Sequence, residues 1–209
     1  MFYLTRPTTA ELDRVLAGCP STRLTYDAVG ATRGTPPAGY YVDRYAVDLG
    51  RGADAFARAC AAVRQFVMYP RPWTSVHRAF DAPHEGAEFV AAIRHLGFWS
   101  ANPCRIVYTI DDSGDAPDGA PGDPPGDQGA PRQRYGFALG TLDGHVETGE
   151  ERFEVCRDTR TDVVSYRVVA FSRPRVLLAR LGTPIARMLQ RRFGRESRQA
   201  MVQAVTRPG

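Results

Sequence analysis

The N-terminal residues carry the spacing and the capping groups of a helix. Thr8 is placed to cap a helix over 9–17, Glu11 completes a capping box with it, and Gly18 supplies a stop. The next segment, 20–39, shows no regular period between apolar positions. We therefore expect a short helix at the N-terminus, followed by a connection without regular structure.

Two elements with different periods come after this connection. Residues 40–50 alternate apolar and polar side chains, which predicts a half-buried strand. Spacings of three and four residues then predict a helix in the segment 51–70, which Pro70 is expected to close. Residues 85–100 fit both a helix and a strand by pattern alone.

Clear alternation returns over 102–112, where Ile106 and Tyr108 share the apolar face of a predicted strand. The tract that follows, 113–133, is rich in Pro, Gly and Asp and cannot bury enough apolar surface to offset its ordering entropy. We interpret it as a long, disordered hairpin loop, because strand-like sequence lies on both sides. A tolerated insertion and a substrate lid are both open interpretations of this loop.

Three more strands are predicted at 134–142, 150–158 and 161–172. The short turns between them, one of which contains Asp143 and Gly144, imply antiparallel neighbours in a meander.

The chain ends in a long amphipathic helical region over 173–205. Thr183 is placed to cap a helix in this region, with Pro184 in its first turn. Four arginines follow at helical spacing opposite the apolar stripe. A solvated face is the plain interpretation, and an acidic partner or a membrane surface is the alternative. The four arginines are Arg187, Arg191, Arg195 and Arg198.

The order of these elements predicts one α+β domain spanning 1–209, with residues 1–20 as an N-terminal helical addition. An antiparallel sheet has to cover its apolar face, and the C-terminal helix is the element long enough to do so. Gly136 and Gly140 would permit a sharp bend in the sheet. We expect a bent antiparallel sheet that grips a long C-terminal helix and leaves a space between them.

Composition removes several classes of chemistry. All 27 basic residues are arginine, so Schiff-base catalysis and a lysine-containing phosphate loop are excluded. The four cysteines and four histidines show no metal-ligand spacing, and we expect neither a metal nor a cofactor. A net charge of +4 with scattered arginines gives no case for a nucleic-acid partner. The sequence has no transmembrane run or signal peptide, so the cytoplasm is the expected location, and a homo-oligomer stays open.

Several stretches together resemble an uncharacterised START-like (helix-grip) family of unknown function found in bacteria and plants. The resemblance covers about residues 22 to 205, and the 113–133 tract departs from it as an apparent insertion. The stretches that carry it are VGATRG (29–34), YYVDRYAVDLGRG (40–52), NPCRIVYTID (102–111), YGFALGTLDGHVETGEERFEV (135–155) and AFSRPRVLLARLGTPIARMLQRRFGRESRQAM (170–201).

The resemblance implies a helix-grip fold similar to lipid-transfer domains and aromatic polyketide cyclases, which enclose apolar or aromatic small molecules between sheet and helix. It brings no reaction and no catalytic residues to this chain. It also favours a strand over a helix for 87–96.

Alternation along the strand predicted at 150–158 separates neighbouring glutamates. Glu150 and Glu154 share a charged face that suits water, whereas Glu151 shares the other face with Phe153. Burial on that apolar side would raise the pKa of Glu151 and suit it to proton transfer. The alternative is a structural salt bridge, for example with Arg105 or an arginine of the C-terminal helix.

Two further residues complete a candidate catalytic set with Glu151. His145 follows a predicted turn and would act as a general base if the hairpin brought it to Glu151. Tyr108 would present its phenol to the cavity from the apolar face of its strand. For each of the two, an ordinary structural role is the competing interpretation.

Six residues are candidate ligand contacts. For the aromatic ones the competing interpretation is a place in the core. For the polar ones, strand-end hydrogen bonding is favoured over capture of a ligand carboxylate. The six residues are Trp73, Trp99, Asn102, Arg105, Tyr166 and Phe193.

Three functions are consistent with the sequence. The first is binding of an apolar or aromatic small molecule between sheet and helix. The second is a cofactor-independent cyclase, isomerase or lyase in the same space. The third is a protein-interaction module that uses the arginines of the last helix.

Overall fold

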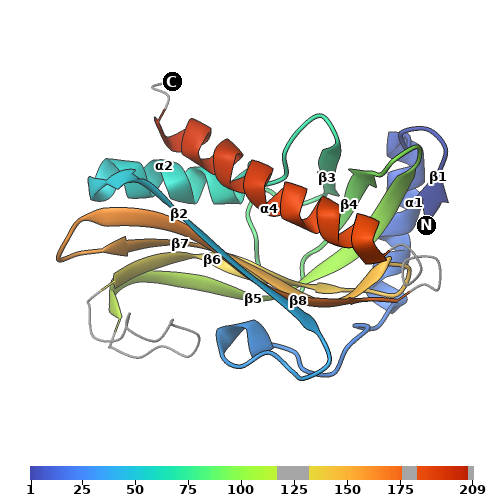
Figure 1. Cartoon of the computed structure of the whole chain (residues 1–209), viewed down its shortest axis with the longest axis horizontal. Helices are drawn as coiled ribbons and strands as arrows, with labels where there is room; N and C mark the ends of the chain where they lie inside the picture. Colours follow the sequence, from blue (N-terminus) through green and yellow to red (C-terminus); the bar gives the residue numbers. More distant parts are fainter. Residues whose placement is uncertain (117–131, 176–182, 207–209) are drawn as a thin grey trace.

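The computed structural model describes residues 1–116, 132–175 and 183–206, so most of the predicted 113–133 loop lies outside the described residues. Within these ranges, eight strands form one antiparallel sheet in the order β2-β8-β7-β6-β5-β4-β3, with β1 beside β5 (Figure 1). The strands are β1 Phe2–Tyr3, β2 Tyr41–Arg51, β3 Thr74–Arg78, β4 Glu88–Arg94, β5 Trp99–Ala116, β6 Arg132–Thr141, β7 Glu147–Asp158 and β8 Val163–Pro174.

The predicted meander is confirmed. β5, β6, β7 and β8 pair consecutively and antiparallel, because the connections between β6, β7 and β8 are too short for any other arrangement. The segment that fitted both a helix and a strand forms β4, as the family resemblance favoured. β3, in a segment for which we predicted no element, adds an edge strand beside β4.

Three α-helices and two 3₁₀ turns accompany the sheet in the described part of the chain. The capping box predicted at the first helix is confirmed, since Thr8 and Glu11 exchange hydrogen bonds there. The segment predicted to be irregular, 20–39, contains the second 3₁₀ turn and the last two residues of the first. The helical elements are α1 Thr9–Gly18, η1 Cys19–Ser21, η2 Ala31–Arg33, α2 Gly52–Arg64 and α4 Thr183–Thr206.

The second helix is shorter than predicted, because it ends at Arg64 and not at Pro70. Gln65 caps it, and Phe66 then takes a left-handed backbone with φ of 56°. This turn places the Phe66 ring in the core, 5.0 Å from the Phe137 ring and 5.2 Å from the Phe89 ring. Core packing of one aromatic side chain therefore overrides the apolar spacing that suggested a longer helix.

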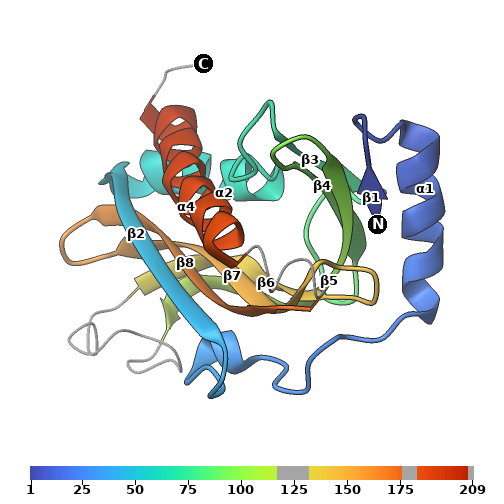
Figure 2. The ribbon, with the colours of Figure 1, turned by 45° about the vertical axis from the view of Figure 1, so that its right-hand side comes forward.

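α2 and α4 lie on one face of the bent sheet, which we call the inner face (Figures 1 and 2). The expected α+β architecture, with a bent antiparallel sheet around a long C-terminal helix and an added N-terminal helix, is confirmed. Beneath α2 and the C-terminal half of α4 the inner face is sealed by side chains without solvent exposure, including Phe137, Phe153, Tyr166 and Met201.

The opposite face of the sheet, the outer face, is covered as well. α1 packs there over Val90 and Ala92 of β4 and Trp99 of β5 (Figure 2). The segment 22–34 also lies against this side, where Leu24 forms a bridge with Leu142. The expectation of one open, polar face is therefore wrong, because an aperiodic segment and an added helix cover it.

Candidate functional site

Glu150, on the outer face of β7, is held by groups from the 22–34 segment. Its carboxylate accepts hydrogen bonds from the Tyr26 hydroxyl at 2.7 Å, the Gly30 backbone N–H at 2.7 Å and the Thr32 backbone N–H at 2.9 Å. The Thr32 hydroxyl donates a fourth. Gly30 has a left-handed φ of 83°, which helps the N–H groups of Gly30 and Thr32 to point toward the carboxylate. We call this arrangement the Glu150 clamp.

The charged row that contains Glu150 is buried, which corrects the expectation that it faces water. Glu150, Arg152 and Glu154 expose only 2%, 3% and 2% of their surface. Arg134 and Arg152 both pair with the Glu154 carboxylate. The alternation that assigned these residues to one face was right, but the cover over that face could not be read from a strand pattern.

Tyr108 belongs to the outer face, whereas the sequence pattern placed it on the inner face. The β5–β6 register shifts between Ile106 and Tyr108, so Ile106 pairs with inner-face Leu139 and Tyr108 pairs with outer-face Ala138. The Tyr108 hydroxyl lies 2.7 Å from the Thr32 hydroxyl. Tyr108 therefore supports the Glu150 clamp, and the bulge separates it from Glu151.

Glu151 points to the inner face, as the alternation predicted. In the sheet it stands between Leu139 of β6 and Ala170 of β8, and Asp43 of β2 pairs with the far side of Ala170. Glu151 and Ala170 are both partly accessible, unlike the sealed half of this face. Within the described ranges, no hydrogen bond or ion pair involves Glu151, so the predicted salt bridge with Arg105 is absent.

The other polar groups beside Glu151 form a network with the first half of α4. Arg187 binds Asp43 with two hydrogen bonds of 2.6 and 2.8 Å. Arg187 also donates to the Gln190 side chain at 2.7 Å, and Gln190 donates to Glu147 at 2.8 Å and to Ser172 at 3.0 Å. The network fixes α4 to β2, β7 and β8 beside Glu151. We call Glu151 and these neighbours the inner-face carboxyl site.

The electrostatics of this site favour a protonated Glu151. Burial raises the pKa of Glu151 to about 8, and the nearby charges of Glu147 and Asp43 act in the same direction. The pKa of Glu147 is also raised, mainly by burial, while its hydrogen bonds and Arg187 oppose the rise. At neutral pH the site can therefore offer a carboxylic acid O–H, which donates a hydrogen bond or a proton.

His145 is not brought to Glu151. It lies in the β6–β7 hairpin, where its Nδ1 accepts a hydrogen bond of 3.0 Å from the Glu147 backbone N–H. Burial lowers the pKa of His145 to about 3, so the ring stays neutral over the physiological range. The proposed set of Glu151, His145 and Tyr108 is thus divided between the inner face, a hairpin and the outer face.

Residues 25–200 match the model of a family described as a domain of unknown function, DUF1990. The chain belongs to this family. The expected membership in an uncharacterised family found in bacteria and plants is confirmed. The matched range contains both the Glu150 clamp and the inner-face carboxyl site.

Curated relatives from distant organisms carry no more specific description. A UPF0548 protein of Deinococcus radiodurans is 30% identical over 215 residues, which cover 98% of this chain and 98% of the relative. A UPF0548 protein of Dictyostelium discoideum is 33% identical over 171 residues, which cover 78% and 72% of the two chains.

Among solved structures, the DUF1990 chain is similar to several proteins at low sequence identity. The protein Ara h 8.0201 has a TM-score of 0.48 and 11% identity, with 80% of this chain and 98% of that chain covered. A START superfamily protein from Mycobacterium smegmatis has a TM-score of 0.46 and 10% identity, with 79% and 99% covered.

Three of the six candidate ligand contacts serve to attach α4. The Tyr166 hydroxyl lies 2.9 Å from the Ser197 hydroxyl inside the sealed half of the inner face. The Trp73 indole N–H donates to Glu196 at 2.6 Å. Phe193 packs edge-on between Trp73 and Tyr69, with ring centroids 6.3 and 5.5 Å away.

Trp99 and Asn102 lie away from Glu151. Trp99 is buried beneath α1 on the outer face, with Arg6 over its ring. Asn102 is fully buried and donates hydrogen bonds to the Ala91 carbonyl at 3.1 Å and the Ser100 hydroxyl at 2.8 Å. It lies inside β5, which begins three residues earlier at Trp99, and these hydrogen bonds account for its side chain without a ligand.

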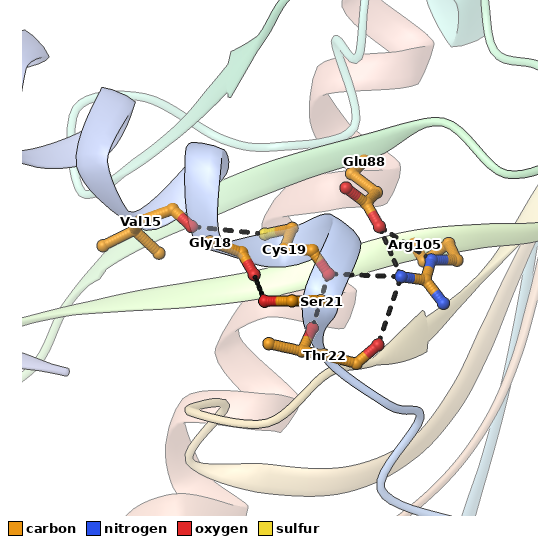
Figure 3. Close-up of polar contacts among 7 residues, drawn as sticks. All are labelled: Val15, Gly18, Cys19, Ser21, Thr22, Glu88 and Arg105. Carbon is orange, nitrogen blue, oxygen red and sulfur yellow. Dashed lines mark hydrogen bonds and ion pairs between the residues drawn. The ribbon is translucent and has the colours of Figure 1, made fainter.

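Arg105 anchors the turn that follows α1 (Figure 3). Its Nε donates to Glu88 at 2.8 Å, and its terminal nitrogen donates to the carbonyls of Cys19 and Thr22 at 3.2 and 3.3 Å. Figure 3 shows the guanidinium pointing at this turn, which the Ser21 and Thr22 hydroxyls also brace. These contacts account for Arg105 without a ligand.

The sequence interpretation missed several members of the carboxyl site. Glu147 was missed because β7 begins at Glu147 and not at residue 150; with the longer strand, alternation puts it on the face of Glu151. Arg187 was assigned to a solvated face, yet it binds Asp43. Arg198, similarly, lies over the Tyr45 ring. No local pattern marks such helix-to-sheet contacts.

Proposed function

We propose that this protein binds an apolar or aromatic small molecule between the inner face of the sheet and the first half of α4, with the Glu151 carboxyl as the polar contact. One observation carries the proposal: Glu151 is partly accessible under α4 and has no partner in the described part of the chain. A desolvated carboxyl without a partner is costly, and folds retain such groups mainly at functional sites.

The surroundings set the chemistry of the ligand. Leu139 and Ala170 flank Glu151 in the sheet, so the body of the ligand would meet apolar surface. A protonated carboxyl donates one hydrogen bond and accepts others, which suits a ketone, phenol or amide group on that ligand. The expected ligand is therefore mainly apolar or aromatic and carries one polar group.

Binding to a library of lipids and aromatic metabolites tests the proposal, with thermal shift as the screen and calorimetry for each hit. Glu151→Gln should weaken a hit about tenfold, equivalent to about 1.4 kcal/mol. Ala170→Leu should weaken it as well, because the larger side chain occupies the space beside Glu151 while the carboxyl remains. Glu85→Gln, at an exposed glutamate, is the matched control. No saturable hit, or hits that neither inner-face variant affects, would contradict the proposal.

Catalysis without a cofactor is the second candidate, and the raised pKa of Glu151 favours it. An acid with a pKa of about 8 is protonated at neutral pH. Because its pKa lies close to the working pH, it can also give up its proton at little cost in free energy. If a hit is turned over, the rate should fall as pH rises through about 8. Turnover that Glu151→Gln leaves unchanged would exclude this role.

None of the described helices is long and apolar enough to cross a bilayer.

A further inference from the structure

β2 is an edge of the sheet that only β8 pairs with in the described part of the chain (Figure 2). Its 11 residues are mostly exposed or half-exposed, including the large side chains of Tyr41 and Val42. An unpaired strand of this length presents a row of backbone N–H and C=O groups that another strand can bind. Such an exposed edge is a candidate site for pairing with another strand.

The sequence of β2 is self-complementary about Ala46. Residues 44–48 read Arg-Tyr-Ala-Val-Asp, with opposite charges two positions before and after the central alanine. In an antiparallel pair centred on Ala46, Arg44 of each copy would face Asp48 of the other, and Tyr45 of each copy would face Val47 of the other. Directly opposed residues share a face of the sheet, so both kinds of pair would form twice.

We propose that two copies of this chain pair edge to edge through β2, antiparallel about a two-fold axis at Ala46, to form one continuous sheet. Such an isologous interface uses the same surface on both copies and closes without leaving a free edge of β2. The inference is independent of the proposed ligand.

The surroundings of Arg44 and Asp48 support pairing with a second copy of the chain. Arg44 and Asp48 are both exposed, and no hydrogen bond or ion pair within the described residues involves either of them. Both lie on the outer face of β2, four residues apart along the strand, too far to pair with each other. A second copy supplies an opposite charge at each position.

The strand geometry is suitable for this register. β2 pairs with β8 without a shift from Tyr41 to Asp48, and the irregularity lies beyond it, between Asp48 and Gly50. The self-complementary residues are therefore in a regular stretch. Ala46, at the proposed axis, is exposed and small.

A hollow beside the edge offers room for the side chains of the second copy. It has a volume of about 480 Å³ and lies between Val47 and the exposed side of α4. In the continued sheet, Tyr45 and Val47 of a second copy would project from the same face as Val47 of the first copy, next to this hollow. Its lining residues are Val47, Arg195, Arg198, Gln199, Val202 and Gln203.

Charge reversal tests the proposed dimer in the full chain by sedimentation velocity across a dilution series. Arg44→Asp and Asp48→Arg should each weaken dimerisation roughly 30-fold, because two attractive pairs become repulsive in each case. The double variant restores opposite charges and should return to within about threefold of the wild type. Arg94→Asp, at an exposed arginine of β4, is the control and should leave the dimer unchanged.

Cross-linking tests the register. Ala46→Cys should give a covalent dimer on mild oxidation, because two cysteines at the axis face each other, whereas Ala17→Cys on exposed α1 should not. The four native cysteines are buried and should not interfere. A wild type that stays monomeric, a dimer indifferent to both charge reversals, or no cross-link at position 46 in a dimeric sample would overturn the proposal.

Discussion

Glu150 and Glu151 are adjacent in β7, but their side chains lie on opposite faces of the sheet and differ in their hydrogen-bond partners. Glu150 lies on the outer face, where four donors from Tyr26, Gly30 and Thr32 satisfy its carboxylate. Glu151 lies on the inner face beside Leu139 and Ala170, and no described group donates to it or pairs with it. One residue step along a strand thus separates a structural carboxylate from an unpartnered one.

The difference shows that burial of a carboxylate does not by itself mark function. The surface of Glu150 is 2% exposed, and its role is to attach the 22–34 segment to the sheet. The candidate for function is the carboxyl that burial destabilises and that no protein group compensates. The comparison can be tested at either glutamate.

Removal of the Glu150 carboxylate should have the largest effect. Glu150→Ala leaves the half-buried N–H of Gly30 and the buried N–H of Thr32 without an acceptor, and a buried group of this kind costs about 1–3 kcal/mol. We expect a loss of about 4 kcal/mol in the free energy of unfolding, measured by urea denaturation. Glu85→Ala, at an exposed glutamate, should change it little. A Glu150→Ala protein as stable as the wild type would remove the distinction between the two carboxyls.

Crowding the Glu150 clamp should have a smaller effect. A Cβ at position 140 would lie 2.5 Å from the Tyr26 hydroxyl and 2.7 Å from a Leu24 methyl group. Gly140→Ala should therefore push the 22–34 segment away and lower the free energy of unfolding by about 2 kcal/mol. Gly18→Ala is the control, because a Cβ at that position meets no atom within 4 Å. Equal stability of the two variants would mean that this segment is not held closely to the sheet.

Much of this arrangement can be predicted from local sequence pattern. The parts that cannot be predicted in this way share one cause. Alternation separated Glu150 from Glu151 correctly, and the spacing of Thr8 and Glu11 predicted the first cap. Both features depend on residues a few positions apart. The strand bounds were less accurate, and β7 began three residues earlier than predicted.

The errors arise where distant segments meet. The cover over the outer face comes from a segment more than a hundred residues before Glu150, and that segment has no periodicity to reveal its position. The bulge that turns Tyr108 outward depends on how β5 pairs with β6. The bond between Arg187 and Asp43 joins α4 to β2, which lies far earlier in the chain. Such contacts are properties of the assembled fold.

At the unpartnered carboxyl, neutralisation should increase stability in a pH-dependent way. The pKa of Glu151 is raised by burial to about 8 in the folded protein, so the folded state holds a proton that the unfolded state releases near pH 4.3. The stability that this proton contributes is full below about pH 4 and is lost as pH rises through 8. One pKa unit of this shift corresponds to about 1.4 kcal/mol.

Glu151→Gln should therefore be more stable than the wild type by at least about 1.4 kcal/mol at pH 8. The two proteins should become equal toward pH 4. Urea denaturation at a series of pH values measures both arms. A constant difference across the series would show that Glu151 titrates normally and would weaken its candidacy as the functional carboxyl.

The smallest effect concerns the outer layer of the Glu150 clamp. Tyr108→Phe removes the hydroxyl that lies 2.7 Å from the Thr32 hydroxyl and should cost about 1 kcal/mol of unfolding free energy. If Tyr108 acts by orienting Thr32 toward Glu150, the cost should largely disappear when Glu150 is already alanine, and a double-mutant cycle measures this coupling. Additive losses would show that Tyr108 and Glu150 stabilise the outer face separately, and the clamp would then end at Thr32.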